Sequence, residues 1–272
     1  MISVVQLGAI DYATGLSLQQ RLVEMRKDGR IGDVLLLLEH TPVITLGRNA
    51  KARNILAPPE MLAQQGIEVF ETNRGGDVTF HGPGQIVGYP IFDLRGFTSA
   101  DGKRRTMGAI EFVRRLEEVL IRTCAQFQVA TERIAGLTGV WTDPNHGHEA
   151  GGRGVRPYAS GEAKIAAIGV HISRGVTSHG FALNVNTDLS CFDLIVPCGI
   201  ESKPVTSMER ELGKQIDLQD VSHAISRNFG AVFESQVLWL ENLDLLLQPT
   251  IGVPMKPPAE LRRMQGEEDA WA

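Results

Sequence analysis

The chain has 272 residues, of which 43% are hydrophobic and 22% are charged, a composition typical of a globular protein. Its net charge of −5 argues against a nucleic-acid-binding protein, because contacts with phosphates require concentrated lysine and arginine. The first residues contain no basic region leading into an apolar run, and no stretch approaches the roughly 20 apolar residues that cross a bilayer. We therefore expect a soluble, cytoplasmic protein that binds neither nucleic acid nor membrane.

The first predicted elements are a helix over residues 16–25 and a strand over residues 33–39. Leu18, Leu22 and Met25 recur at helical spacing, whereas the second segment is a short, continuously apolar run that is typical of a buried strand. A helix followed by a strand is therefore predicted to open the fold. Two further strands are expected, at 43–46 and 86–92.

A long amphipathic helix is predicted near the middle of the chain. Its apolar stripe consists of Ile110, Val113, Leu116, Leu120, Cys124 and Phe127. This spacing predicts that Cys124 lies in the core. The elements that follow are strands at 139–142, 164–173, 180–185 and 236–240, with a helix at about 218–233. Sheet and helix segments are interspersed, so we predict a mixed α/β domain, in the α/β to α+β range.

Two segments lack any hydrophobic period. Residues 143–161 are rich in glycine, proline and histidine and are predicted to form a long surface loop. Residues 249–272 contain several prolines and an acidic run, which predicts an extended, partly disordered tail. We expect one folded domain over residues 1–248, followed by this tail.

The cysteines and histidines give no metal or disulfide pattern. Cys124, Cys191 and Cys198 form no CxxC pair and are odd in number, so neither a disulfide framework nor a zinc knuckle is predicted. His146 and His148 lack a cysteine or carboxylate at ligand spacing, and we expect no metal site there.

The stretch from Arg74 to Gln85, RGGDVTFHGPGQ, combines four glycines with one histidine. Glycine has no Cβ, so the backbone here can approach a ligand or a neighbouring strand closely. The stretch matches neither the GxGxxG nor the GxxxxGK[ST] phosphate loop. Two interpretations remain: a tight turn that joins two strands, or a binding site in which Arg74, Thr79, His81 and Gln85 take part.

Three other positions are candidates for chemistry. Lys164 begins an apolar strand, where a partly desolvated amine is available as a base, although a lysine at a strand end can also reach solvent. His179 and Gly180 are predicted to open a strand, as structural residues or as part of a site. Cys198 follows an apolar segment and a proline, which predicts an exposed thiol that a nearby cation or base would activate.

Three blocks of the sequence together resemble the lipoyl(octanoyl) transferases, the octanoyl-[acyl-carrier-protein]:protein N-octanoyltransferases. The blocks are RGGDVTFHGPGQIVGYPIFDL, KIAAIGVHISRGVTSHGFALNVN and IVPCGI, and the resemblance spans about residues 3–245. It implies the biotin/lipoate protein ligase-like fold, a single domain with a mixed central sheet flanked by helices. It also implies an enzyme that moves an octanoyl group from acyl carrier protein to a lysine of lipoyl domains, through a cysteine thioester.

The resemblance also implies roles for particular residues. Cys198 would be the acylated nucleophile, and Lys164 would favour its thiolate and shuttle the proton, with a secondary role for His179. The residues implied to bind substrate are Arg74, Gly75, Gly76, Asp77, Val78, Thr79, Phe80, His81, Ala167, Ile168, Gly169, Gly180, Phe181 and Ala182. No cofactor and no metal are implied, because the octanoyl donor is carried on the phosphopantetheine of acyl carrier protein.

The expected partners are acyl carrier protein and the lipoyl domains of 2-oxoacid dehydrogenase complexes and of the glycine cleavage H protein. These partners are acidic, so we expect local basic residues to dock them, with Arg104, Arg105 and Arg114 as candidates, and we expect a monomer. Three alternatives stay open: an ATP-dependent lipoate or biotin protein ligase, a non-catalytic protein that binds an acyl chain or carrier protein, and a cysteine hydrolase.

Overall fold

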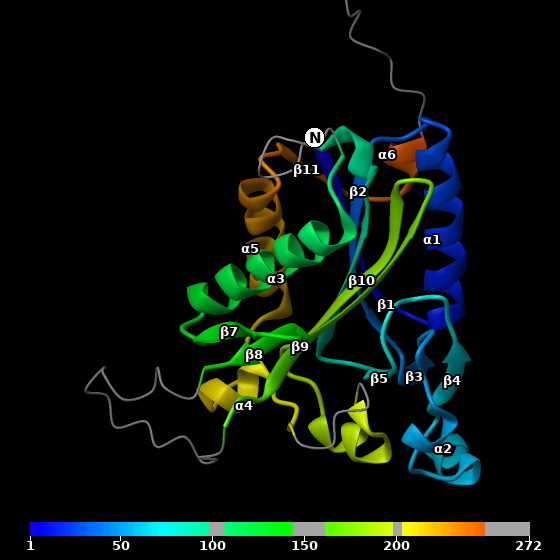
Figure 1. Ribbon diagram of the computed structural model, residues 1–272, viewed down its shortest axis with the longest axis vertical. Coiled ribbons are helices and arrows are strands. Elements are labelled where there is room, and N and C mark those ends of the chain that lie inside the picture. The colour runs from blue at the N-terminus through cyan, green and yellow to red at the C-terminus, as the bar shows by residue number, and fades with distance from the viewer. Residues whose placement is uncertain (98–105, 144–160, 198–202, 248–272) are drawn as a thin grey trace, which may run out of the picture.

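The computed structural model describes residues 1–97, 106–143, 161–197 and 203–247, and its centre is a large mixed β-sheet (Figure 1). Within these residues the sheet has eight strands in the order β11-β1-β2-β6-β10-β9-β8-β7. Their bounds are β1 Ile2–Ile10, β2 Asp33–His40, β6 Gln85–Ile91, β7 Thr131–Ile134, β8 Leu137–Thr142, β9 Lys164–Ser173, β10 Val176–Asn184 and β11 Val237–Leu240. Strand β1 pairs in parallel with β2 and β11, and β6, β10, β9, β8 and β7 pair antiparallel.

A second sheet lies beside the large one and has three described strands in the order β4-β3-β5. Their bounds are β3 Val43–Leu46, β4 Glu68–Glu71 and β5 Val78–His81. The described helices are α1 Tyr12–Lys27, α2 Pro59–Gln64, α3 Ala109–Gln126, α4 Met208–Leu212, α5 Leu218–Val232 and α6 Asp244–Leu247.

The sequence of β2 is continuously apolar because both of its faces are buried. Leu35 and Leu37 belong to the core under α3 and α5, whereas Leu36 and Leu38 belong to the core under α1. Successive side chains of a strand point to opposite faces, and both faces of this sheet are covered by helices. The continuous run is therefore a strand that is buried on both sides.

Helices α3 and α5 pack on one face of the large sheet around a cluster of phenylalanines. The ring centroids of Phe92 and Phe233 lie 5.3 Å apart, and Phe112 lies 6.1 Å from Phe92. Cys124 on α3 is fully buried in this core, which confirms its predicted place. Ile110 is 79% exposed, so its assignment to the apolar stripe was wrong; it lies two residues before buried Phe112, which places it on the opposite side of α3.

Helix α1 covers the opposite face of the sheet (Figure 1). The Asp11 side chain accepts a hydrogen bond from the Thr14 backbone N–H at 2.8 Å and caps the helix, which therefore begins four residues before the predicted segment. The buried side of α1 includes polar Gln19 as well as Leu22. This mixed character explains why periodicity alone located only part of the helix.

The structure differs from the sequence-based expectations in the first element, in the start of one strand and in one strand that was not expected. A strand opens the fold, because β1 precedes α1, whereas a helix was expected first. Strand β10 begins at Val176, so His179 and Gly180 lie inside the strand rather than at its start. The glycine-rich stretch itself contains β5, which pairs with β3, a segment about 35 residues earlier in the sequence. The bounds of β9, in contrast, are those predicted.

Most of the predicted loop, at residues 144–160, and the predicted tail lie outside the described residues. Among the helices that the structure describes, none has the length and apolar character needed to span a bilayer.

Candidate active site

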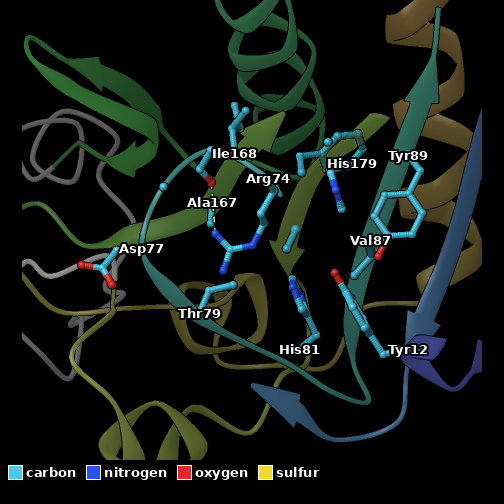
Figure 2. Close-up of a pocket in the computed structure, with 16 residues that line it drawn as sticks. Tyr12, Arg74, Asp77, Thr79, His81, Val87, Tyr89, Ala167, Ile168 and His179 are labelled. Carbon is cyan, nitrogen blue, oxygen red and sulfur yellow. Dashed lines mark hydrogen bonds between the residues drawn. The ribbon is translucent and has the colours of Figure 1, made fainter. Parts of the chain in front are cut away.

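A pocket lies where β5 of the small sheet faces strands β6, β9 and β10 of the large sheet (Figure 2). We call it the central pocket. The residues that line it are Tyr12, Arg74, Gly75, Gly76, Asp77, Thr79, His81, Val87, Tyr89, Ala167, Ile168, Gly169, His179, Gly180, Phe181 and Ala182. It is narrow, with a cavity volume of about 50 Å³.

The central pocket brings together every predicted substrate-binding residue except Val78 and Phe80. These two belong to the core of the small sheet, with Phe80 packed edge-on against Phe192 at 5.7 Å. Strand alternation is the reason, because Thr79 and His81 point into the pocket while their neighbours on β5 point away. Residues 78–81 were predicted to line the pocket as a continuous run, but only Thr79 and His81 face the cavity.

Three lining residues were not predicted from the sequence, namely Tyr12, Val87 and Tyr89. Val87 and Tyr89 lie on β6, and strand alternation from a known lining residue on that strand would have found them. Tyr12 is the first residue of α1, far from the other lining residues in the sequence. Only the packing of α1 against the sheet brings it here.

The glycines allow the backbone of the Arg74–Gln85 stretch to lie directly against β9. The Gly75 N–H donates to the Val170 carbonyl at 3.1 Å, and a Cβ on Gly169 would lie 2.6 Å from the Gly75 oxygen. Any side chain at Gly169 would therefore force the two segments apart. The sequence left open whether these glycines approach a ligand or a strand, and for Gly75 the neighbour is strand β9.

Arg74 is 8% exposed and is held by Thr45 on β3. Its Nε donates to Thr45 Oγ1 at 3.1 Å, and its Nη2 donates to the Thr45 carbonyl at 2.6 Å. A buried guanidinium needs such partners, because leaving it without them would cost several kcal/mol, roughly, in desolvation. Arg74 thus places a fixed positive charge beside the central pocket.

His81 is held in one tautomer by its neighbours. Gln85 Nε2 donates to the Phe80 carbonyl and to Asn184 Oδ1, so Gln85 Oε1 is left to accept from His81 Nδ1, at 2.7 Å. The His81 Nε2 then carries a lone pair, 3.4 Å from Thr45 Oγ1. Burial lowers the pKa of His81 to about 3, with further lowering by His40 and Arg74. His81 is therefore neutral at pH 7.

A second neutral histidine lies behind the pocket. His40 Nδ1 donates to the Ile10 carbonyl at 3.0 Å, and its Nε2 accepts from the Tyr89 hydroxyl at 2.7 Å. Burial lowers the pKa of His40 to about 4. Burial also raises the pKa values of Tyr12 and Tyr89, so both phenols stay protonated. The Tyr12 ring stacks on His81 with centroids 6.3 Å apart.

His179 has a left-handed backbone conformation, with φ of 55°, in the middle of β10. Its Nε2 donates to Asn73 Oδ1 at 2.6 Å, and its backbone N–H donates to Gln19 Oε1 at 2.8 Å. Burial lowers the pKa of His179 to about 4, and Arg74 and His171 lower it further. A residue with a side chain is uncommon at such a φ, which indicates that the surroundings hold it there.

Lys164 is the first residue of β9 and is 7% exposed. Its Nζ lies over the ring of Trp141, 4.7 Å from the centroid. Its backbone N–H donates to the Pro204 carbonyl at 2.8 Å, and its carbonyl accepts from the Thr206 N–H at 2.9 Å. Residues 204–206 therefore pair with the backbone of Lys164.

A small cavity beside the central pocket joins Lys164 to Pro197. Thr79, Ala167 and Ala182 line both cavities, so the two are adjacent and share this wall. A hydrogen-bonded series crosses their shared wall: His81 contacts Gln85, Gln85 contacts Asn184, and Asn184 Nδ2 donates to the Thr206 carbonyl at 3.0 Å. Lys164 and the central pocket therefore lie next to each other.

Cys198 and Gly199 lie outside the described residues, as do Arg104, Arg105, His146 and His148. Of the other cysteines, Cys124 is inert, because burial raises the pKa of its thiol to about 12. Cys191 is half-buried, and burial together with Asp188 and Asp193 raises the pKa of its thiol. Arg114 is described, and its Nη1 pairs with Glu117 at 2.7 Å.

No group of three or more His, Cys, Asp or Glu side chains able to hold a metal ion occurs within the described ranges.

The sequence matches known proteins along most of its length. Residues 11–230 match the family model of the lipoyl protein ligase A/B catalytic domain. An octanoyltransferase of Koribacter versatilis is 56% identical over 268 residues, which cover 98% of each chain. An octanoyltransferase of Acidobacterium capsulatum is 57% identical over 244 residues, covering 89% of this chain and 94% of that one.

Solved structures with a similar fold are lipoate protein ligases. A bipartite lipoate protein ligase of Thermoplasma acidophilum gives a TM-score of 0.62 at 16% identity, over 89% of this chain and 87% of that one. A lipoate-protein ligase A bound with ATP gives 0.61 at 15% identity, over 89% of each chain. At such low identity these structures establish the fold, and they confirm the predicted mixed sheet of the ligase type.

Proposed function

The chain belongs to the octanoyltransferase family, whose members are enzymes of protein lipoylation, and we propose that it transfers octanoyl through a thioester on Cys198, assisted by Lys164. The donor is octanoyl-acyl carrier protein, and the acceptor is a lysine of a lipoyl domain. The observation that carries the proposal is the small cavity that Lys164 shares with Pro197, the residue directly before Cys198.

The reaction has two steps. The Cys198 thiolate attacks the octanoyl carbonyl of the donor thioester, and the phosphopantetheine thiolate leaves and takes up a proton. The neutral amine of the acceptor lysine then attacks the enzyme thioester, and an amide forms as the Cys198 thiolate leaves. One thioester replaces another in the first step and the second is downhill, so no ATP is required.

Lys164 is suited to the proton transfers of both steps. Its ammonium is nearly buried over the Trp141 ring, where a positive charge favours a thiolate nearby. The same group can give its proton to the leaving phosphopantetheine thiolate and later take one from the acceptor amine. Burial lowers the pKa values of His81 and His179, the two histidines that line the central pocket, to about 3 and about 4, which leaves Lys164 as the candidate base.

The central pocket is the proposed acyl site, because it adjoins the Lys164 cavity at Thr79, Ala167 and Ala182. Its walls along β9 and β10 include the small side chains of Ala167 and Ala182, which suit a hydrocarbon chain. Arg74 and His81 contribute polar groups at the β5 wall.

Acyl carrier protein and lipoyl domains are the proposed partners, including those of 2-oxoacid dehydrogenase complexes and the glycine cleavage H protein. We expect the enzyme to act as a monomer. Arg104, Arg105 and Arg114 are proposed to dock these acidic partners. Arg114 is 49% exposed despite its pairing with Glu117.

The test is the intact-protein mass after brief mixing with octanoyl-acyl carrier protein in the absence of an acceptor. One added octanoyl group is expected in the wild type and in Cys191→Ala, and none in Cys198→Ala. An adduct in Cys198→Ala would contradict the proposal. Absence of an adduct in all three proteins, with ATP-dependent transfer of free octanoate, would instead indicate a ligase.

A further inference from the structure

A second cavity lies beyond the central pocket, between α1 and the hairpin of β9 and β10. Leu16 and Val23 on α1 are its apolar lining residues, and the others are polar or charged: Gln19, Gln20, Glu24, Lys27, Asn73, His171, Ser173, Ser178 and His179. Its volume is about 350 Å³, against about 50 Å³ for the central pocket. We call it the outer cavity.

His179 separates the two cavities. Among the described residues it is the only one that lines both the central pocket and the outer cavity. Figure 2 shows its ring beside Tyr89 and Val87, at the end of the central pocket away from Asp77. The Asn73 oxygen holds the ring at 2.6 Å, and Gln19 holds the backbone at 2.8 Å.

The left-handed backbone explains why this side chain lies in the pocket. Phe181, two residues later, sends its ring to the α3–α5 core, where it stacks on Phe229 at 6.0 Å. Regular alternation would turn the His179 side chain to that same core face. The φ of 55° interrupts the alternation and directs the imidazole into the cavity instead, as irregular positions in strands often do.

Paired residues of β9 and β10 line the central pocket between the Lys164 cavity and His179. Ala167 pairs with Ala182, Gly169 pairs with Gly180, and Val170 pairs with His179. Three residues of strand, from Ala167 to Val170, span about 10 Å. This is on the scale of an extended eight-carbon chain.

We propose that His179 closes the far end of the acyl pocket and thereby limits the length of the acyl chain that the enzyme accepts. This inference rests on the proposed function, since it takes the central pocket as the acyl site. A chain much longer than octanoyl meets the imidazole. Without that side chain, the hydrocarbon continues into the outer cavity, past Leu16 and Val23.

The test is a competition between octanoyl-acyl carrier protein and dodecanoyl-acyl carrier protein at equal concentration, read as the ratio of the two enzyme adducts by intact mass. His179→Gly removes the side chain, and glycine adopts the positive φ without strain. The dodecanoyl-to-octanoyl ratio is expected to rise at least tenfold. Asn73→Ala frees the ring without removing it and should give a smaller rise, about threefold.

Arg174→Gly is the matched control, because Arg174 also has a positive φ, lies in the same hairpin and is exposed. Its adduct ratio should equal that of the wild type. An unchanged ratio in His179→Gly overturns the inference, as does loss of both adducts in a folded variant, which would assign His179 to the chemistry. If His179→Gly fails to fold, an unchanged ratio in Asn73→Ala overturns it. A wild type that forms no octanoyl adduct would instead refute the proposed function.

Discussion

The two faces of the large sheet differ in what holds them together. On the α3–α5 face, Phe92, Phe112 and Phe233 pack ring against ring in an apolar core. On the α1 face, part of the space between the sheets is filled by Arg74 and by neutral histidines, each tied to a specific partner. Apolar packing on the α3–α5 face stabilises the fold but is non-directional. Hydrogen bonds on the α1 face hold polar groups in defined orientations.

The largest effect is expected from breaking the apolar face. Phe112→Ala should lower the free energy of unfolding by about 3–5 kcal/mol, because Phe112 is fully buried and its truncation leaves a cavity. Ile110→Ala, in the first turn of the same helix, should change it by less than about 0.5 kcal/mol, because Ile110 is exposed. Urea denaturation measures both. Equal losses in the two variants would contradict the difference in burial.

On the pocket face, Lys164→Met should slow octanoyl transfer by about 100-fold or more while the fold is retained. Methionine keeps most of the aliphatic stem over Trp141 and removes the amine. Lys203 also lies over the Trp141 ring, at 5.8 Å, and its ammonium pairs with Glu162. Lys203→Met should therefore transfer at close to the wild-type rate. Near-normal transfer by Lys164→Met would remove this residue from the mechanism.

The histidines should make the pocket face sensitive to acid. The pKa of His81 is lowered to about 3, and those of His40 and His179 to about 4, from an ordinary value of 6.5. Between these values the unfolded chain binds more protons than the folded one. Stability is therefore fully present above pH 6.5 and falls as the pH falls towards 4, by roughly 1.4 kcal/mol per pH unit for each histidine.

Unfolding free energies measured at pH 7, 6 and 5 test this expectation. His40→Gln should reduce the slope by about one proton, because one buried neutral imidazole is gone. Phe112→Leu should lower the curve by a similar amount at every pH, because it changes only apolar packing. Parallel curves for wild type and His40→Gln would show that His40 does not contribute.

The smallest expected effect separates the two described cysteines. Cys124→Ala should lower the free energy of unfolding by about 1 kcal/mol through lost packing in the α3–α5 core, with transfer unchanged. Cys191→Ala, at a half-buried position, should lower it by only a few tenths. A marked loss of transfer in Cys124→Ala would be unexpected for a thiol that is inaccessible to substrate.

Much of the α3–α5 face was predictable, because its elements carry their own periodic signal. The stripe from Leu116 to Cys124 identified α3, and the apolar run that begins at Lys164 identified β9 with correct bounds. Strand β1 was missed; it pairs in parallel with β2 and β11, and its side chains are buried on both faces of the sheet. Pairing of distant segments leaves little trace in a local pattern.

The pocket face was predictable only as a set of candidate residues. Residue patterns singled out Arg74, Lys164, His179 and Cys198 as candidates, whereas the family resemblance supplied most of the lining and the nucleophile role of Cys198, which stays a prediction. The motifs could not show that Val78 and Phe80 turn away from the cavity, because β5 was not recognised as a strand.

The amino-acid sequence by itself determined the family, the α3 helix, the β9 strand and the approximate membership of the site, because these depend on residue types at short spacing. Only the tertiary structure decided that Tyr12 and Tyr89 line the pocket, that Gln85 selects the tautomer of His81, and that His179 separates two cavities. These features depend on segments far apart in the chain, as when Asn184 orients Gln85, or on one backbone dihedral angle at His179, and the local sequence shows neither.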